Sequence, residues 1–311
     1  MERLRVHIGP FSEKIDHHSR ILLLGSCFSQ EIHDRFKYHG FNSSSNPFGT
    51  VFHPEPLARF ILETLSGRVE ERMHLREDVY LSWDASALVY GMTENELRER
   101  LSAIRNEWRE KLVKADFLFV TFGTAWGYKQ KEDGLIVANC HRLPQSGFDK
   151  ELSRIDQIVW IWQEVIKALK QINPTIQIIF TVSPVRHYRD GLIENNRSKA
   201  VLHLAIEELR KLTNSYYFPS YEIIVDELRD YRYFTEDLVH PNSLAVNYLW
   251  DRFKDVIMND ETKKISAKVA SLRRQSEHRF IHPESEESYH FRLKTSSDID
   301  QLLHDHPEIV W

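Results

Sequence analysis

The sequence predicts an α/β protein, built as a three-layer α/β/α sandwich with a mainly parallel sheet and with β insertions. The first observation is a set of short, continuous apolar runs at 20–25, 117–122 and 176–182. A run that is apolar at nearly every position is typical of a strand buried on both faces. The second observation is that long helical patterns separate these runs, which favours parallel strands covered by helices. Such sheets place their working residues at the carboxyl ends of the strands.

The first strand leads directly into a helix. RILLLG at 20–25 ends in glycine, and SCFSQEIHDRFKY follows at 26–38 with apolar residues at helical spacing. Gly40 supplies the stop. We therefore expect strand, tight turn and helix in immediate succession.

Further helices are expected along the chain. The segment 93–114 opens with Thr93 three residues before Glu96, the arrangement of a capping box, and carries an apolar stripe. The other helical patterns cover 151–171, 195–212 and 243–258.

Two less regular stretches, 72–91 and 126–140, are predicted to be β insertions that decorate the strand ends. In the second, Asp133 and Gly134 lie between two extended runs, which is a hairpin signal.

The end of the chain differs in composition. From about 261 it is polar and charged, so we expect a domain at 1–260 and a C-terminal extension at 261–311, a helix followed by a loosely ordered segment. The apolar residues that are able to dock this segment are Leu302, Leu303, Ile309, Val310 and Trp311.

Composition excludes several classes of protein. Lys+Arg total 41 and Asp+Glu 46, a formal charge of −5, and clustered basic residues for binding nucleic acid are absent. No apolar run is long enough for a membrane span, and no signal peptide is visible at the N-terminus. The two cysteines, Cys27 and Cys140, are too few for a disulfide scaffold or a four-cysteine zinc site. We expect a cytoplasmic protein without metal or cofactor, and the sequence sets no oligomeric state.

Four segments hold the candidate chemistry: 25–29 (GSCFS), 46–50 (NPFGT), 122–126 (FGTAW) and 237–241 (DLVHP). The first lies at the turn from strand to helix. A helix N-terminus favours negative charge, so a nucleophile there gains stabilisation of a thiolate or of an oxyanion on the substrate.

The last segment places Asp237 three residues before His240. One turn of chain is enough to bring the carboxylate to the ring, where it fixes the tautomer and stabilises the imidazolium. The spacing therefore predicts a general base, His240, that is oriented by Asp237.

These segments resemble the GSCFA family. ILLLGSCFS matches the motif for which the family is named, and further characteristic stretches follow in order: NPFGTVFHP, TFGTAWGY, TVSPVRH, NNRSKAVLH and DLVHPN. The resemblance covers roughly 1–260. That family is similar to the SGNH/GDSL hydrolases, which implies a flavodoxin-like sheet and the hydrolysis of ester (O-acyl) bonds through a covalent acyl-enzyme intermediate.

The resemblance leaves two candidates for the nucleophile. In the SGNH pattern it is the second residue after the strand-ending glycine, which here is Cys27, whereas a shift of one residue makes it Ser26. We prefer Cys27, with His240 and Asp237 completing the triad.

The resemblance also implies an oxyanion hole in which Gly49 takes the place of the second-block glycine. The third-block asparagine is missing, because 123–125 is GTA. One lost donor costs about two to three orders of magnitude in rate unless another group replaces it. Candidates for the replacement are Thr124, Asn46, Asn139 and His141.

The substrate is predicted to be a small-molecule or carbohydrate acyl ester. Candidate contacts are Asn46, Trp126, His141, Arg186 and His187. An O-acyltransferase and a catalytically silent SGNH-like binding module are the alternatives. His17 and His18 are expected to be solvated, and His278 with His282 lacks the third ligand of a metal site.

Overall fold

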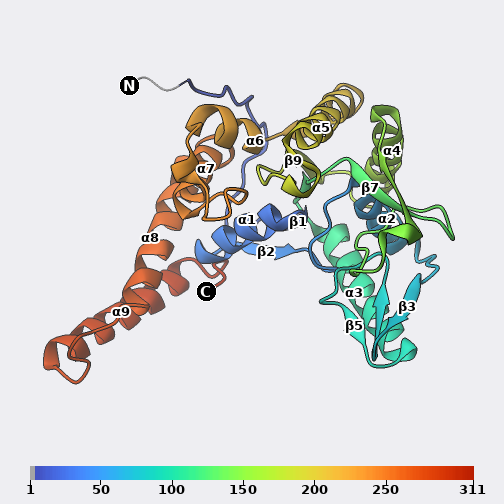
Figure 1. Ribbon diagram of the computed structural model, residues 1–311. Coiled ribbons are helices and arrows are strands. Elements are labelled where there is room, and N and C mark those ends of the chain that lie inside the picture. Colours follow the sequence, from blue (N-terminus) through green and yellow to red (C-terminus); the bar gives the residue numbers. More distant parts are fainter. Residues whose placement is uncertain (1–3) are drawn as a thin grey trace.

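The computed structural model describes residues 4–311 and has a parallel five-stranded sheet at its centre (Figure 1). Its strands are β1 (Arg20–Gly25), β2 (Asn42–Ser45), β6 (Phe117–Phe122), β9 (Gln177–Val182) and β10 (Tyr216–Tyr217). Their spatial order is β2-β1-β6-β9-β10, and each neighbouring pair is parallel. This is the flavodoxin-like order, in which the chain reverses direction across the sheet beside its first strand.

Successive residues of the central strands point into two different cores. In β1, Leu22 and Leu24 belong to one apolar cluster, whereas Ile21 and Leu23 belong to the other. Since β6 alternates in the same way, the sheet is buried on both faces and the predicted three-layer α/β/α class is confirmed.

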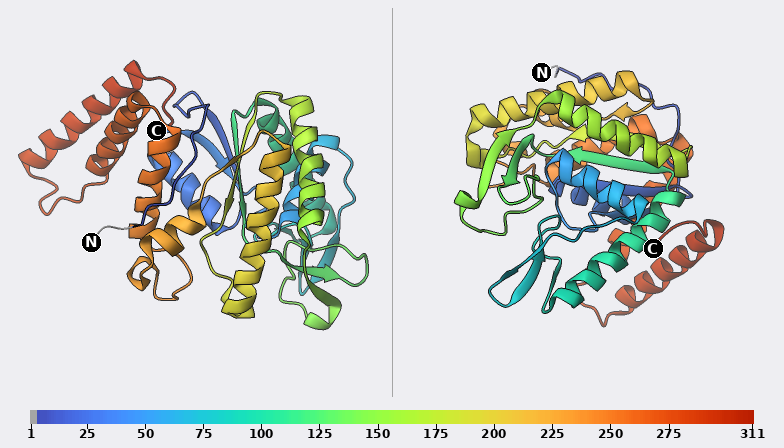
Figure 2. Two further views of the ribbon diagram at one scale, coloured as in Figure 1. Left: turned by 90° about the horizontal axis from the view of Figure 1, so that it is seen from above. Right: turned by 90° about the vertical axis from the view of Figure 1, so that its right-hand side faces the viewer.

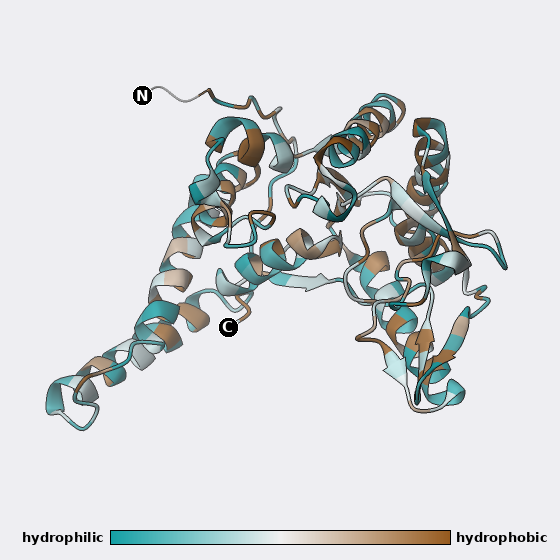
Figure 3. Cartoon of the chain, viewed as in Figure 1, coloured by the Kyte–Doolittle hydropathy of each residue, from teal (hydrophilic) through white to brown (hydrophobic). Residues whose placement is uncertain are grey.

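Helices cover both faces of the sheet. One face packs against α1 (Cys27–Tyr38) and α7 (Ser243–Ile257). The other packs against α2 (Pro54–Ser66), α3 (Glu94–Lys114), α4 (Ile155–Ile172) and α5 (Leu192–Leu212). Figure 3 shows hydrophilic and hydrophobic residues alternating along α1 and α5, as expected of helices with one buried side.

Short elements complete the connections. They are the helical turns η1 (Gln145–Gly147), η2 (Tyr188–Asp190), α6 (Ser220–Glu222), η3 (Ile223–Leu228, a π-helix) and η4 (Tyr231–Tyr233).

The insertions form two small antiparallel sheets. β3 (Met73–Arg76), β4 (Val79–Ser82) and β5 (Tyr90–Gly91) lie within the predicted stretch 72–91. β7 (Trp126–Gln130) pairs along its length with β8 (Phe148–Leu152). The expected hairpin within 126–140 is present as a short antiparallel return: a bridge joins Lys129 and Ile136, the Gln130 N–H donates to the Leu135 carbonyl at 2.9 Å, and the Val137 N–H donates to the Tyr128 carbonyl at 3.0 Å.

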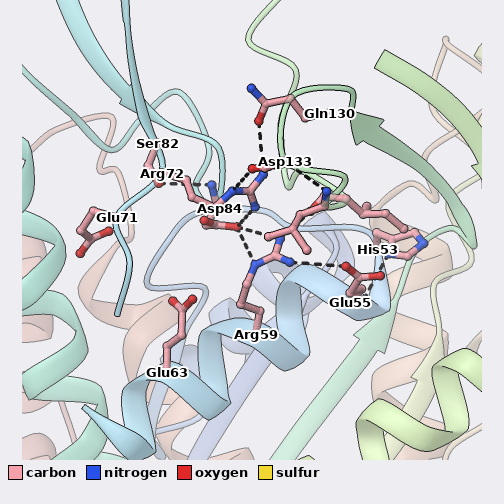
Figure 4. A network of polar contacts seen from close by, with 12 residues as sticks. His53, Glu55, Arg59, Glu63, Glu71, Arg72, Ser82, Asp84, Gln130 and Asp133 are labelled. Carbon is pink, nitrogen blue, oxygen red and sulfur yellow. Dashed lines mark hydrogen bonds and ion pairs between the residues drawn. The ribbon is translucent and has the colours of Figure 1, made fainter. Parts of the chain in front are cut away.

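A buried ionic network fastens these insertions to α2 (Figure 4). The Asp84 carboxylate, whose side chain is 6% exposed, accepts hydrogen bonds from Arg59 Nε (2.9 Å) and Arg72 Nη1 (3.1 Å). Arg72 Nε also donates to Asp133 Oδ2 at 2.7 Å. The Asp84 carboxylate therefore links Arg59 of α2 to Arg72, which directly precedes β3. Arg72 in turn holds Asp133 in the turn after β7.

The C-terminal extension is more ordered than expected. α8 (Asp260–Ser276) and α9 (Glu286–Asp305) pack side by side and project from the body (Figures 1 and 2). Leu302 and Ile309 are buried against α8, and the Val310 N–H donates to the Gly40 carbonyl at 2.9 Å. The predicted loose segment is thus a second helix whose end returns to α1.

His17 is also placed differently from the expectation. Its ring is 3% exposed and stacks on Phe41 with ring centroids 4.2 Å apart. Its Nε2 lies 3.1 Å from the His39 carbonyl, so this histidine is a core residue, while His18 is exposed as expected.

Within residues 4–311, no helix has the length and apolar character needed to cross a membrane. The sequence shows no signal peptide at the N-terminus, and residues 1–3 of that segment lie outside the described residues.

Candidate active site

A glycine shapes the turn between β1 and α1. Gly25 has φ +130°, and a Cβ at this position would lie 2.1 Å from the Thr121 carbonyl oxygen. Only glycine is compatible with both features. The Gly25 N–H donates to Asn46 Oδ1 at 2.8 Å, which ties the turn to the end of β2.

The two candidate nucleophiles occupy different environments. Ser26 is fully buried and is the N-cap of α1, where its hydroxyl accepts a hydrogen bond from the Phe28 N–H at 3.3 Å. Cys27 is the first residue of the helix and is half-buried. The structure therefore uses the serine as a cap and leaves the thiol accessible.

The thiol is subject to opposing influences. Burial raises the pKa of Cys27, and Glu31 on the same helix adds to that effect. The backbone N–H groups of Phe28 and Cys27, together with the charge of Lys199, act to lower the pKa. These N–H groups are the free donors that a helix N-terminus offers to an anion.

Asp237 and His240 are in direct contact. His240 Nδ1 lies 2.7 Å from Asp237 Oδ2, and Asp237 Oδ1 accepts from the Thr235 hydroxyl and from the N–H groups of Val239 and His240 at 2.6–3.0 Å. These donors hold the pKa of Asp237 well below its ordinary value. A carboxylate at Nδ1 fixes that nitrogen as the donor, which leaves Nε2 as the proton acceptor.

The loop that carries this pair is tightly held. Leu238 adopts φ +59°, an uncommon conformation for a branched residue. The Thr235 N–H donates to the His240 carbonyl at 2.8 Å, and Asn242 caps α7 while donating to the Arg232 carbonyl at 2.7 Å. The Asp237–His240 geometry is thus set before any ligand binds.

The thiol and the imidazole are not hydrogen-bonded in the part of the chain that the structure describes. Among residues 4–311, no hydrogen bond joins Cys27 or Ser26 to a ring nitrogen of His240. The ring charge of His240 acts instead on His187, and the Arg186 N–H reaches the Val239 carbonyl at 3.5 Å. The loop after β9 therefore lies against the loop that carries His240.

His187 is held as a neutral ring. Burial, followed by the charge of Lys199, lowers the pKa of His187 to about 4. Its Nε2 is buried without a hydrogen-bond partner, and the ring meets Phe52 edge-on with centroids 5.0 Å apart. Arg186 lies over the Phe234 ring at 5.4 Å. Both residues follow the end of β9, as the sequence predicts, and their contact with a substrate stays a prediction.

Gly49, the expected oxyanion donor, is engaged within its own turn. The Gly49 N–H donates to the Asn46 carbonyl at 2.8 Å inside a turn, so this donor is occupied. Asn46 is better placed: its Oδ1 is fixed by the Gly25 N–H, and its Nδ2 is buried with no partner. A fixed, unsatisfied amide next to the turn that carries the two candidate nucleophiles is the kind of donor that an oxyanion requires.

The other candidate donors are engaged inside the fold. The Thr124 hydroxyl pairs with Ser198 Oγ at 2.9 Å and accepts from the Trp126 N–H at 3.0 Å. Asn139 Oδ1 accepts from the His141 N–H at 2.7 Å. These contacts give Thr124 and Asn139 structural partners.

His141 is buried and Trp126 is partly buried, each in local packing. The His141 ring is 2% exposed, its Nε2 lies 2.7 Å from the Ser82 carbonyl, and it packs beside Trp83. The Trp126 indole donates to the Glu194 carbonyl at 3.2 Å, and Lys150 lies over its ring at 4.6 Å.

Sequence reasoning missed Lys199. This residue lies on the buried side of α5, is 2% exposed, and donates from Nζ to the carbonyls of Gly123 and Ser183 at 2.7 Å each. The available signal was a lysine on the apolar stripe of a helix, three residues before Leu202. Within residues 4–311, no group of three or more His, Cys, Asp and Glu side chains is arranged to hold a metal ion.

Known proteins resemble this chain in sequence and in fold. The model of the GSCFA family matches residues 20–253. No curated protein matches the chain. An acetyl xylan esterase from the rumen bacterium Butyrivibrio proteoclasticus is 12% identical with a TM-score of 0.37, covering 76% of this chain and 64% of its own.

A carbohydrate esterase of family 3 from Talaromyces cellulolyticus is also 12% identical, with a TM-score of 0.31, covering 76% of this chain and 95% of its own. TM-scores of this size are too low to indicate a shared activity.

Proposed function

Since the chain belongs to the GSCFA family, whose model covers residues 20–253, we propose that it is an ester hydrolase with Cys27 as its nucleophile. The observation that carries the proposal is the contrast at the first turn: Ser26 is buried as a helix cap, while Cys27 is half-buried at the helix N-terminus. The Asp237–His240 pair supplies the second element of the chemistry.

The reaction has two halves. His240 Nε2 takes the thiol proton, and Cys27 Sγ bonds to the acyl carbon of the ester. The bond from that carbon to the alcohol oxygen then breaks, and the alcohol leaves with the proton from His240. Water attacks the resulting thioester with His240 again as base, which releases the carboxylic acid and restores the thiol. Asp237 stabilises the imidazolium in both halves.

The oxyanion is held by the Cys27 N–H at the start of α1 and by Asn46 Nδ2. Catalytic hydrogen bonds are often long without substrate and shorten in the Michaelis complex. In this mechanism the loop that carries His240 brings Nε2 within hydrogen-bond distance of the Cys27 thiol when the ester binds, so that the proton passes directly between them.

The proposed substrate class is a small-molecule or carbohydrate acyl ester. Arg186 and His187 lie next to the loop that carries His240 and are the proposed contacts to the leaving alcohol. The two free thiols and the reactive role of one of them suit a reducing, cytoplasmic location.

The direct test is turnover of p-nitrophenyl acetate and butyrate. We expect Cys27→Ala and His240→Ala to lose more than about 10²-fold in kcat/KM, since each removes a reacting group. Cys140→Ala is the matched control and should retain wild-type turnover. Ser26→Ala should stay active but less stable by about 1 kcal/mol, because it loses a helix cap. Full activity of Cys27→Ala together with loss in Ser26→Ala would assign the nucleophile to Ser26.

A silent binding module is the second candidate function. It is favoured by one observation, that the Gly49 N–H is already bonded to the Asn46 carbonyl. The test is a panel of acetyl, butyryl and longer acyl esters, with either water or an added alcohol as the acceptor. If the wild-type protein turns over none of them, the result favours this candidate over both the hydrolase and an O-acyltransferase.

A further inference from the structure

Lys199 is a buried cation that the proposed mechanism does not use. It projects from the inner side of α5, with Ser198 and Leu202 as buried neighbours on the same helix. A lysine that is 2% exposed is rare, because removing an ammonium group from water is costly unless the protein supplies partners.

The partners of Lys199 are two strand ends. Nζ donates to the carbonyl of Gly123, directly after β6, and to that of Ser183, directly after β9, at 2.7 Å each. β6 lies between β9 and β1, and β1 leads into Cys27. The ammonium group is therefore at the same edge of the sheet as the proposed nucleophile.

No counter-charge neutralises this ammonium in the part of the chain that the structure describes. No carboxylate lies within ion-pair distance of Nζ, and the Tyr221 ring of α6 faces it at 5.7 Å. The ionisable groups that interact with Lys199 are Cys27 on α1, His187 after β9 and His203 on α5. Cys27 is the one among them that becomes an anion while the histidines stay neutral.

We propose that Lys199 is a positioning residue for Cys27: it joins the ends of β6 and β9 beside the nucleophile and supplies the positive charge that favours its thiolate. This inference rests on Cys27 as the nucleophile of the proposed function.

The electrostatics agree with this role. Burial lowers the pKa of Lys199 to about 7, and the neighbouring Cys27 opposes that shift. Burial is the largest influence on Cys27 and raises its pKa overall; the N–H groups of Phe28 and Cys27 and, after them, the charge of Lys199 act in the opposite direction. Protonated lysine and deprotonated thiol therefore stabilise each other in a region with little water.

The test measures the thiol itself and needs no ester turnover. In a Cys140→Ala background, the rate of Cys27 alkylation by iodoacetamide is followed against pH by mass spectrometry. We expect Lys199→Met, which keeps the length of the side chain, to move the midpoint up by about one pH unit, so that alkylation at pH 7 is about ten-fold slower. Lys199→Arg should return the midpoint towards that of the wild type.

Lys170→Met is the matched control. Lys170 also donates to two backbone carbonyls, those of Pro174 and Ile176, but it is not among the charges that act on Cys27. This variant should leave the alkylation profile unchanged. A folded Lys199→Met with the wild-type profile would overturn the proposal.

A second measurement covers the case in which Lys199→Met does not fold. In the wild type, Cys27 should titrate well below Cys140, whose pKa burial raises to about 11. Equal midpoints for the two thiols would overturn the role of Lys199. If the alkylation midpoint of Cys27 lies clearly below that of Cys140 but the protein hydrolyses no ester, the result refutes the proposed function and keeps the lysine–thiol pairing.

Discussion

At the residue scale, the amide of Asn46 is the side-chain donor that we propose for the oxyanion hole. Its oxygen is committed to the Gly25 N–H at 2.8 Å, which fixes the orientation of the amide. The opposite end, Nδ2, is buried and has no acceptor. A buried donor without a partner costs about 1–3 kcal/mol, so a ligand that accepts from it gains that amount.

We predict that Asn46→Ala lowers kcat for p-nitrophenyl acetate by about 10²-fold, as expected for the loss of one oxyanion donor. KM should change much less, because the donor acts on charge that develops in the transition state. Steady-state kinetics on the purified variant measure both.

Asn139→Ala is the control for that experiment. Within the described residues, the one hydrogen bond of the Asn139 side chain is the bond that its Oδ1 accepts from the His141 N–H. A loss in Asn139→Ala equal to that in Asn46→Ala would mean that general weakening of the fold, and not a missing donor, slows the reaction.

The sequence predicts contacts between residues that are close along the chain better than contacts that depend on the tertiary fold. The contact between Asp237 and His240 is set by three positions of chain and is present at 2.7 Å. The expected Gly49 donor depends instead on how the turn at 46–49 closes, and there the Asn46 carbonyl takes the N–H. Lys199 was missed because a charged residue on a helix is assumed to face solvent.

At the element scale, the length and character of a buried run decide how well it is predicted. The strands at 20–25 and 117–122 match their predicted bounds, and the third begins one residue later than expected, at Gln177. All three are apolar because both faces are covered. β2, with the sequence NSSS, was missed because it is a polar edge strand, and Phe148–Leu152 was partly assigned to the following helix.

The ionic network at Asp84 is what holds the insertions on α2. Two guanidinium groups, those of Arg59 and Arg72, converge on a carboxylate that is 6% exposed (Figure 4). Removal of one partner from a buried pair leaves uncompensated charge, which is far more costly than loss of a surface pair.

We predict that Asp84→Ala lowers the free energy of unfolding by about 3–5 kcal/mol. Urea denaturation followed by circular dichroism measures it. Glu77→Ala, which removes a carboxylate that is 81% exposed and pairs with Arg76, should change stability by less than about 1 kcal/mol. An Asp84→Ala variant as stable as Glu77→Ala would show that the network orients the insertions without stabilising them.

At the scale of the whole molecule, the C-terminal pair of helices packs around an apolar cluster of its own. Val269 and Leu272 of α8 pack with Leu302 and Ile309 in a cluster separate from the two cores that flank the sheet. This separation supports the proposed division at 1–260 and 261–311.

The returning end of the chain is a point of attachment to the body. At Gly40, which has φ +84°, a Cβ would lie 2.9 Å from the Ile309 side chain, so glycine is needed for the end to seat against α1. The adjacent Val310 N–H donates to the Gly40 carbonyl, and Arg273 of α8 lies over the Trp311 ring at 5.1 Å. Ile309 is thus the apolar anchor of this contact.

We predict that Ile309→Ala releases the end of the chain, because it leaves a cavity between Gly40 and Val269 that costs about 2–4 kcal/mol of local stability. Hydrogen exchange at the Val310 amide should accelerate, and limited proteolysis should cut within α9 before the body. Val310→Ala, at a side chain that is 44% exposed, should behave as the wild type. Since the anchor lies outside the site at the strand ends, alkylation of Cys27 should be unchanged. Loss of Cys27 reactivity in Ile309→Ala would instead make the extension part of the catalytic domain.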